Sequence, residues 1–149
     1  AKLSAMKNLL LPILSAGLLL AAGCERDPYP LDLERFDAIW YDIDGSGSRT
    51  PGDEIDFDIR VNTTDPDADD QFITDWDISY SVNNTFVGVI DSDSGMNANT
   101  LSFVGTASIK NLPRPFAGPL QPGDRFEFRF YAVDNHGTFI EQYYTFTLE

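Results

Sequence analysis

Residues 125–133 read RFEFRFYAV and residues 54–62 read EIDFDIRVN, and these two stretches decide the fold class. In each of them apolar and polar residues alternate one by one. This is the pattern of a β-strand that has one face in a core and the other in water. The predicted inward residues are Phe126, Phe128 and Phe130 in the first stretch, and Ile55, Phe57, Ile59 and Val61 in the second.

Further stretches of strand character are separated by clusters of turn-forming residues. Residues 74–82 (TDWDISYSV) alternate in the same way, with Trp76, Ile78, Tyr80 and Val82 inward. The remaining predicted strands are residues 35–43, 85–90, 101–110 and 138–148, with tight turns at residues 83–84 and 134–137. From residue 34 onward nothing has helical periodicity. The sequence therefore predicts an all-β antiparallel sandwich of about seven strands in two packed sheets.

The stretch LQPGDRFEFRFYAVDNHG, residues 120–137, adds a resemblance to this pattern. It resembles the late hairpin of immunoglobulin-like and fibronectin-III-like modules in bacterial surface proteins. The resemblance implies an immunoglobulin-like β-sandwich for residues 34–149. Pro-Gly-Asp occurs twice, at residues 51–53 and 122–124, and each copy is predicted to be a turn that enters a strand.

The composition is strongly acidic, with a formal net charge of -14. Such a surface repels nucleic acid, so we expect no nucleic-acid partner, and it attracts divalent cations. The chain is nevertheless 42% hydrophobic and 13% aromatic, which is enough to build a core. It has one cysteine, so no intramolecular disulfide is possible and burial alone must stabilise the domain.

Residues 1–23 have the organisation of a bacterial signal peptide. Met6 is the expected true start, which leaves residues 1–5 upstream of it. Lys7 supplies the positive charge, and residues 9–20 form an apolar run. This run is too short for the roughly 20 residues that a permanent membrane-spanning helix needs.

Cys24 directly follows Ala21-Ala22-Gly23, and this order resembles the bacterial lipobox. The resemblance implies that Cys24 receives a diacylglycerol and a further acyl chain, such as palmitate. More than one acyl chain anchors a protein stably in a membrane. Residues 24–33 would be the lipidated cysteine and a tether. The expected location is the bacterial cell envelope, at the outer rather than the inner membrane. The alternative is a plain secretory signal with an incidental cysteine.

The segment DIDGSGSRTPGD, residues 42–53, has the spacing of a twelve-residue calcium loop. It resembles the calcium loops of dockerins, with Gly47 at the sharp turn. The predicted ligands are Asp42, Asp44, Ser46, Ser48 (through its carbonyl), Thr50 and Asp53. Arg49 and Pro51-Gly52 depart from the EF-hand pattern, because an apolar residue and an exit helix usually stand there. The alternative is an acidic, glycine-rich loop that holds no ion.

Two further acidic segments, residues 65–70 and 91–94, are predicted to be loops. Either segment would complete an ion site, or both are solvated loop tips. Residues 112–122 contain several prolines and Phe116, and they form either a contact loop or a cover over a sheet edge.

Enzyme chemistry finds little support in this sequence. His136 is the only histidine and falls in a predicted turn, so the familiar triads and zinc sites lack their residues. The aromatic residues fill the core or form an exposed row that stacks on sugars or contacts a protein; they are Trp40, Tyr41, Trp76, Tyr80, Tyr131, Tyr143 and Tyr144.

These features predict a membrane-anchored, non-catalytic binding or accessory module, with calcium as its one possible cofactor. One alternative is a structural subunit of an outer-membrane protein complex. A second alternative is a carbohydrate-binding module. The partners expected in these three cases are the membrane through the lipid anchor, together with a protein or a glycan.

Overall fold

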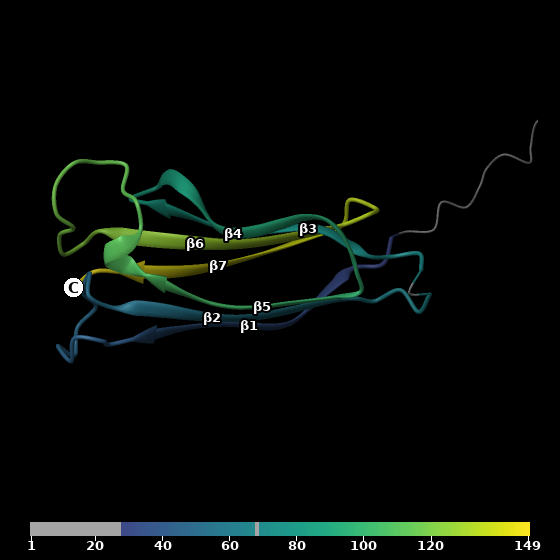
Figure 1. The fold of residues 1–149 in the computed structure, drawn as a ribbon, viewed down its shortest axis with the longest axis horizontal. Helices are drawn as coiled ribbons and strands as arrows, with labels where there is room; N and C mark the ends of the chain where they lie inside the picture. The colour runs from purple at the N-terminus through teal and green to yellow at the C-terminus, as the bar shows by residue number, and fades with distance from the viewer. Residues whose placement is uncertain (1–27, 68) are drawn as a thin grey trace, which may run out of the picture.

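The computed structural model describes residues 28–67 and 69–149 of the chain. In this part of the chain, seven strands form two antiparallel sheets that lie face to face (Figure 1). One sheet has the strand order β1-β2-β5 and the other has the order β4-β3-β6-β7. The predicted all-β sandwich is therefore confirmed. Cys24, the predicted signal peptide and the first part of the predicted tether lie outside the described residues.

The bounds of most strands agree closely with the predicted stretches. The elements are β1 (Leu31–Tyr41), β2 (Glu54–Thr63), β3 (Ile73–Val82), β4 (Thr85–Ala98), β5 (Thr100–Ser108), the short 3-10 helix η1 (Ile109–Asn111), β6 (Arg125–Asp134) and β7 (Phe139–Thr147). Both predicted turns are present. Asn83 and Asn84 have φ values of 50° and 65°, as a tight two-residue hairpin turn requires.

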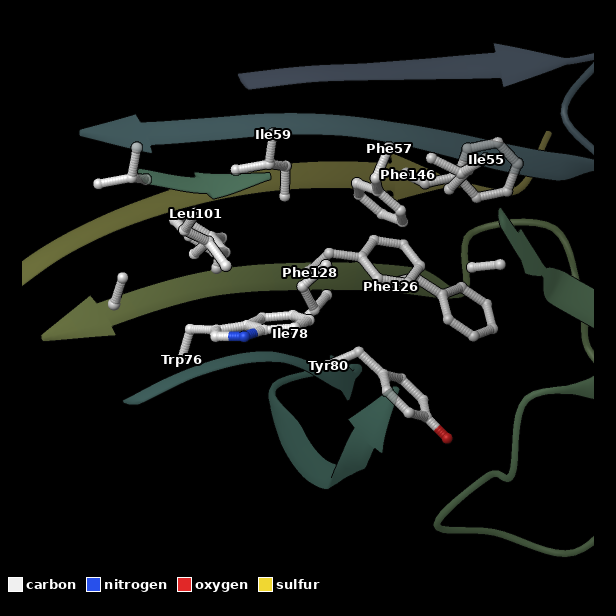
Figure 2. Packing of buried hydrophobic residues seen from close by; sticks show 14 of the residues in the cluster. Ile55, Phe57, Ile59, Trp76, Ile78, Tyr80, Leu101, Phe126, Phe128 and Phe146 are labelled. Carbon is white, nitrogen blue, oxygen red and sulfur yellow. The ribbon is translucent and has the colours of Figure 1, made fainter. Parts of the chain in front are cut away.

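The core lies between the sheets and contains the residues whose alternation predicted it (Figure 2). Every predicted inward residue of β2 and β6 is at most 2% exposed. Phe57 of the first sheet meets Phe128 of the second with ring centroids 5.4 Å apart, and Trp76 meets Phe103 at 5.1 Å. These aromatic contacts join the two layers where the chain has no disulfide to do so.

Strand β1 differs from the predicted strand of residues 35–43 at both ends, and it ends at Tyr41. It begins at Leu31 rather than at residue 35, and it therefore includes residues 31–33, which the sequence assigns to the tether. The reason is a register shift between Leu33 and Arg35. This bulge changes which residues face inward, from Leu31 and Leu33 before it to Phe36, Ala38 and Trp40 after it. A single alternating pattern consequently does not extend across the whole strand.

Strand β4 also differs, because it continues to Ala98 instead of ending at residue 90. The prediction that residues 91–94 form a loop is wrong. Asp91 pairs with Ile78 of β3, and Asp93 pairs with Trp76. Because β4 is an edge strand, its side chains are mostly solvated, and acidic residues on an edge oppose pairing with another chain.

The sandwich has two ends with different contents (Figure 1). The entry pole is the end where the described chain begins, with Tyr29, residues 64–67 and 69–72 between β2 and β3, and the turn of residues 135–138. The far pole contains the loop of residues 42–53, the proline-rich segment 112–122 and the C-terminus. Strand β1 runs from the first to the second, and its 11 residues span about 35 Å.

The proline-rich segment covers the far pole. Leu112, Phe116 and Leu120 pack against the core between the sheets. The hydroxyl of Tyr80 donates a hydrogen bond to the Pro113 carbonyl at 3.0 Å, and Figure 2 shows this hydroxyl pointing out of the core towards the segment. The segment therefore covers the end of the core and not a sheet edge, as the predicted cover would, and its role as a contact loop stays a prediction.

Candidate calcium site

The predicted calcium loop connects β1 to β2 at the far pole. Carboxylate oxygens of Asp42, Asp44 and Asp53 all lie within 4.8 Å of one another. Ligand oxygens at about 2.4 Å from a calcium ion lie up to roughly 5 Å apart, so these three oxygens fit around one ion. The structure thus brings together the three acidic residues that the spacing predicted.

The head of this loop is shaped by Asp42 and Asp44. The Ser46 N–H donates to both carboxylates, at 3.0 Å to Asp42 and 2.9 Å to Asp44. The Gly47 N–H donates to the other oxygen of Asp42 at 2.8 Å. Gly47 has a φ of 76°, in the left-handed region that favours glycine, so the sharp turn predicted at this position is present.

The three non-acidic predicted ligands are in the loop but bond to their neighbours. The Thr50 hydroxyl donates to Asp44 Oδ2 at 2.6 Å, and the Ser46 hydroxyl donates to the Ser48 carbonyl at 3.0 Å. A hydroxyl that donates its hydrogen still has oxygen lone pairs for a cation. The oxygens of Ser46, Ser48 and Thr50 can therefore bind a cation in addition to the three carboxylates. Their hydrogen bonds alone do not direct them towards one ion position.

Asp44 is held in its ionised form. Its pKa is lowered from 3.8 to about 2, chiefly by the hydrogen bond from Thr50 and next by those from Ser46. Hydrogen bonds to a carboxylate favour the charged state. Asp44 therefore presents a negative charge to a cation over the whole ordinary pH range.

Asp53 has a second role that its position in the spacing did not predict. It is 0% exposed and accepts three hydrogen bonds, from Trp40 Nε1 at 2.9 Å, from the Ile43 N–H at 3.2 Å and from the Thr50 N–H at 2.7 Å. A carboxylate has about four lone-pair positions. One position remains for a metal, so Asp53 would bind through one oxygen, unlike the bidentate residue that ends an EF-hand loop.

Arg49 explains one departure from the EF-hand pattern. Its guanidinium carbon lies 5.7 Å from the ring centroid of Trp40 and 5.8 Å from that of Phe146, so its positive charge faces two aromatic rings. Its carbonyl accepts a hydrogen bond from the Glu149 N–H at 2.9 Å. Arg49 therefore joins the loop to the C-terminal residues, through its carbonyl to Glu149 and through its guanidinium to the Phe146 ring.

Neither of the other acidic segments completes this site. Strand β2 runs from the candidate site at Glu54 to Thr63, so the described acidic residues Asp65, Asp67, Asp69 and Asp70 follow it at the entry pole. Its 10 residues separate the two loops by about 30 Å. Residues 91–94 lie in β4, which does not border the loop of residues 42–53. Of the two alternatives for these segments, completion of the ion site at Asp42, Asp44 and Asp53 is therefore not supported by their positions.

The entry pole has a polar network that the sequence did not reveal. Gln71 is 0% exposed, and its amide nitrogen donates to Asp134 Oδ2 at 2.7 Å and to the Tyr29 carbonyl at 2.8 Å. His136 lies in the turn predicted for it, and its Nε2 contacts the Asp70 carbonyl at 2.6 Å. Because a carbonyl can only accept, this nitrogen is the donor, and the histidine joins two loops.

The aromatic residues divide between core and surface. Trp76 and Tyr80 are buried, whereas Tyr41 and Tyr143 are 46% and 49% exposed. Trp40 and Tyr144, the neighbours of the exposed pair, turn inward and pack against the core, as alternation predicts. Of the seven aromatic residues that the sequence offered for an exposed row, only Tyr41 and Tyr143 are exposed.

A cluster of rings lies on the outer face of the second sheet, where β6 pairs with β7. Tyr131 meets Phe139 with centroids 5.8 Å apart, and the guanidinium carbon of Arg129 lies 4.8 Å from the Tyr131 ring. Tyr143 pairs with Arg129 across the two strands, and its hydroxyl donates to Glu141 at 3.3 Å. We refer to Arg129, Tyr131, Phe139, Glu141 and Tyr143 as the aromatic face.

No known family model matches this chain, and comparisons with curated proteins and with solved structures find no match. Among the described residues, 28–67 and 69–149, the structure has no helix that is both long and apolar enough to cross a membrane.

Proposed function

We propose that this chain is a lipid-anchored protein of the bacterial cell envelope that presents a non-catalytic β-sandwich as a binding or accessory module. The observation that carries the proposal is the position of Cys24, the one cysteine of the chain. It follows the apolar run of residues 9–20 and three small residues, and a folded domain begins seven residues later with β1. A lipidated cysteine directly before a folded body is the arrangement of an anchored domain.

The strand order supports an immunoglobulin-like or fibronectin-III-like sandwich as the type of module. In a constant-type immunoglobulin domain, the fourth strand lies beside the fifth. Here β4 pairs with β3 instead, in the sheet that also contains β6 and β7. We therefore favour the fibronectin-III-like arrangement within this group.

Calcium is the cofactor that we propose for the far pole. The three clustered carboxylates of Asp42, Asp44 and Asp53 repel one another unless a cation lies between them. An ion at this point would join the end of β1 to the start of β2. Its role would be stability of the far pole, because it would hold together the two strand ends that the loop connects.

The aromatic face is the surface that we propose for binding. Phe139 and Tyr143 are 59% and 49% exposed beside a guanidinium and a carboxylate. Aromatic rings that stack, combined with charged groups that hydrogen-bond hydroxyls, suit a sugar, and this observation favours a carbohydrate-binding module as the second candidate function. Retention of a glycan by the wild-type chain, and its loss in Tyr143→Ala, would establish that function; no retention would reject it.

The experiment that tests anchoring compares the wild-type chain with Cys24→Ser in bacterial cells. The wild-type protein is expected in the membrane fraction and labelled by radioactive palmitate. The variant is expected to be unlabelled and released from that fraction. A variant that remains membrane-bound and labelled would contradict the proposal. Co-purification of the wild-type chain with one outer-membrane protein after mild detergent extraction would instead favour the subunit alternative.

A further inference from the structure

Strand β5 is a free edge of the first sheet. It pairs with β2 on one side, and among residues 28–67 and 69–149 the backbone of residues 101–107 is hydrogen-bonded only along β2. Its sequence, TLSFVGTAS, contains no charged residue, and its pairing with β2 has no register shift. β5 is therefore a regular, uncharged strand that presents a row of backbone N–H and C=O groups.

The other three edge strands of the two sheets have features that oppose pairing. β1 has charged residues and a bulge between Leu33 and Arg35. β4 has Asp91 and Asp93, and its pairing with β3 has three register shifts. β7 has Glu141 and lies close to β1 of the other sheet. Charges and bulges are common means by which proteins keep an edge from pairing with another chain, and of these four strands only β5 has neither.

The middle of β5 has an exposed apolar residue. Val104 is the fifth of nine residues and is 79% exposed, the largest exposed fraction among the large hydrophobic residues of the described chain. Ser102 and Thr106 are also exposed and lie on the same face, two residues before and after it. If two copies of β5 pair antiparallel about a two-fold axis at Val104, this residue faces its own copy and Ser102 faces Thr106. Such a register removes apolar surface of Val104 from water and forms Ser–Thr cross-strand pairs.

The charges nearest to the centre of this edge do not oppose a second copy. Asp58 lies opposite Val104 on β2 and forms an ion pair with Arg35 at 2.7 Å. In the paired arrangement, three strand spacings separate Asp58 from its copy, which is about 14 Å. This distance exceeds the screening length of about 8 Å in physiological salt. The net charge of -14 therefore adds little repulsion at this edge.

The same register brings opposite charges into line on either side of the axis. On β2, Arg60 lies opposite Ser102, and Asp56 lies opposite Thr106. When Ser102 of one chain faces Thr106 of the other, Arg60 of the first chain lies in one row with Asp56 of the second. The row repeats once on the other side of the axis, so a copy of this chain offers a complementary arrangement of charge.

We infer that the partner of β5 is a second copy of this chain, paired edge to edge and antiparallel about Val104. The three strands of each first sheet then form one continuous six-stranded sheet. The same patch is used on both chains, as in an ordinary two-fold dimer. Because a single pair of edge strands makes a small interface, the dimer is expected to exchange with the monomer and to depend on concentration. The aromatic face lies on the other sheet and stays uncovered.

Disulfide cross-linking tests this register. Each variant is made in the full chain with Cys24→Ser, so that the introduced thiol is the only one, and is purified in mild detergent and oxidised with copper phenanthroline. Val104→Cys is expected to give a covalent dimer as its main product, because its two thiols face each other. Ser102→Cys or Thr106→Cys alone should give several-fold less dimer, because each lies about 13 Å along the strand from its own copy. A mixture of these two variants should cross-link.

Val104→Cys that cross-links no more than Ser102→Cys or Thr106→Cys would overturn the inference. Val104→Lys supplies a second readout without oxidation, because it places a charge at the centre of the edge, opposite its own copy. In sedimentation velocity at equal concentration, this variant should shift from dimer to monomer with an unchanged circular dichroism spectrum. Val89→Lys is the matched control on the other sheet, where Val89 is 52% exposed, and it should sediment as the parent chain does. A Val104→Lys chain that remains as dimeric as the control would also reject the proposed interface.

Discussion

Trp40 Nε1 donates a hydrogen bond to Asp53 Oδ2 at 2.9 Å and so joins the end of β1 to the turn that enters β2. The carboxylate that receives it also accepts the backbone N–H groups of Ile43 and Thr50. Asp53 is consequently both a candidate calcium ligand and the residue that closes the loop of residues 42–53 without a metal. This double role makes the far pole sensitive to a single substitution.

Asp53→Asn is expected to destabilise the fold by about 2–4 kcal/mol, because an amide nitrogen would face N–H donors that the buried carboxylate oxygens now accept. The measurement is chemical denaturation monitored by tryptophan fluorescence, in the absence of calcium. Asp124→Asn is the matched control. Asp124 ends the second Pro-Gly-Asp turn and accepts the Gln121 N–H at 2.8 Å, as Asp53 accepts that of Thr50, but it is partly exposed.

The control should lose about 1 kcal/mol or less, since water can replace a missing partner at an exposed group. Equal losses in the two variants would show that burial of Asp53 and its bond to Trp40 add nothing to the turn itself.

Calcium is expected to raise the melting temperature of the wild-type chain, and chelation is expected to lower it again. A ligand at a hundred times its dissociation constant stabilises the folded state by about 2.7 kcal/mol. The double variant Asp42→Asn/Asp44→Asn should lose this response while it keeps its fold, because both residues lie in an exposed part of the loop. A wild-type melting temperature that chelation leaves unchanged would reject the calcium proposal.

Stability should also decrease in acid because of Asp44. Its pKa in the folded chain is lowered from 3.8 to about 2 by the bonds from Thr50 and Ser46. A lowered folded-state pKa means that the ionised carboxylate stabilises the fold above the unfolded value and that this contribution is lost as pH falls towards the folded value. The free energy of unfolding, measured from about pH 5 down to about pH 2 without calcium, should fall more steeply in wild type than in Asp44→Asn. Parallel curves would contradict this assignment.

Gly105→Ala is expected to destabilise the fold by about 1–3 kcal/mol, because a Cβ at this position would overlap the Phe103 ring that packs on Trp76. The near-ultraviolet circular dichroism of Trp76 should change together with the free energy of unfolding. Gly88→Ala is the control, since a Cβ there meets no heavy atom within 4 Å. If both variants have wild-type stability, the packing of Phe103 over Gly105 is not a constraint on β5.

The strands that were predicted correctly from the sequence are those in which apolar and polar residues alternate without a break, because every second residue then faces the core. In β2, Ile55 to Val61 alternate without interruption, and all of the inward residues are buried. The prediction of strand bounds failed where the backbone changes its register or where a strand has no buried face. The bulge after Leu33 hid the first part of β1, and the acidic second half of β4 looks like a loop because an edge strand can be solvated on most of its length.

The candidate site shows the same limit at the level of single residues. Spacing alone brought Asp42, Asp44 and Asp53 together, because a twelve-residue loop constrains its own ends. The role of Arg49 depends on Trp40 and on Phe146, almost a hundred residues away, and the network around Gln71 joins three separate segments. Such contacts follow from how the sheets pack, so local sequence patterns do not report them.

The lipid on Cys24 is tested most directly by the intact mass of the protein extracted from bacterial membranes. The expected result is a chain that begins at Cys24 and has the added mass of a diacylglycerol and a further acyl group. A membrane-extracted or secreted chain whose mass corresponds to unmodified amino acids, with Cys24 carrying a free thiol, would contradict it.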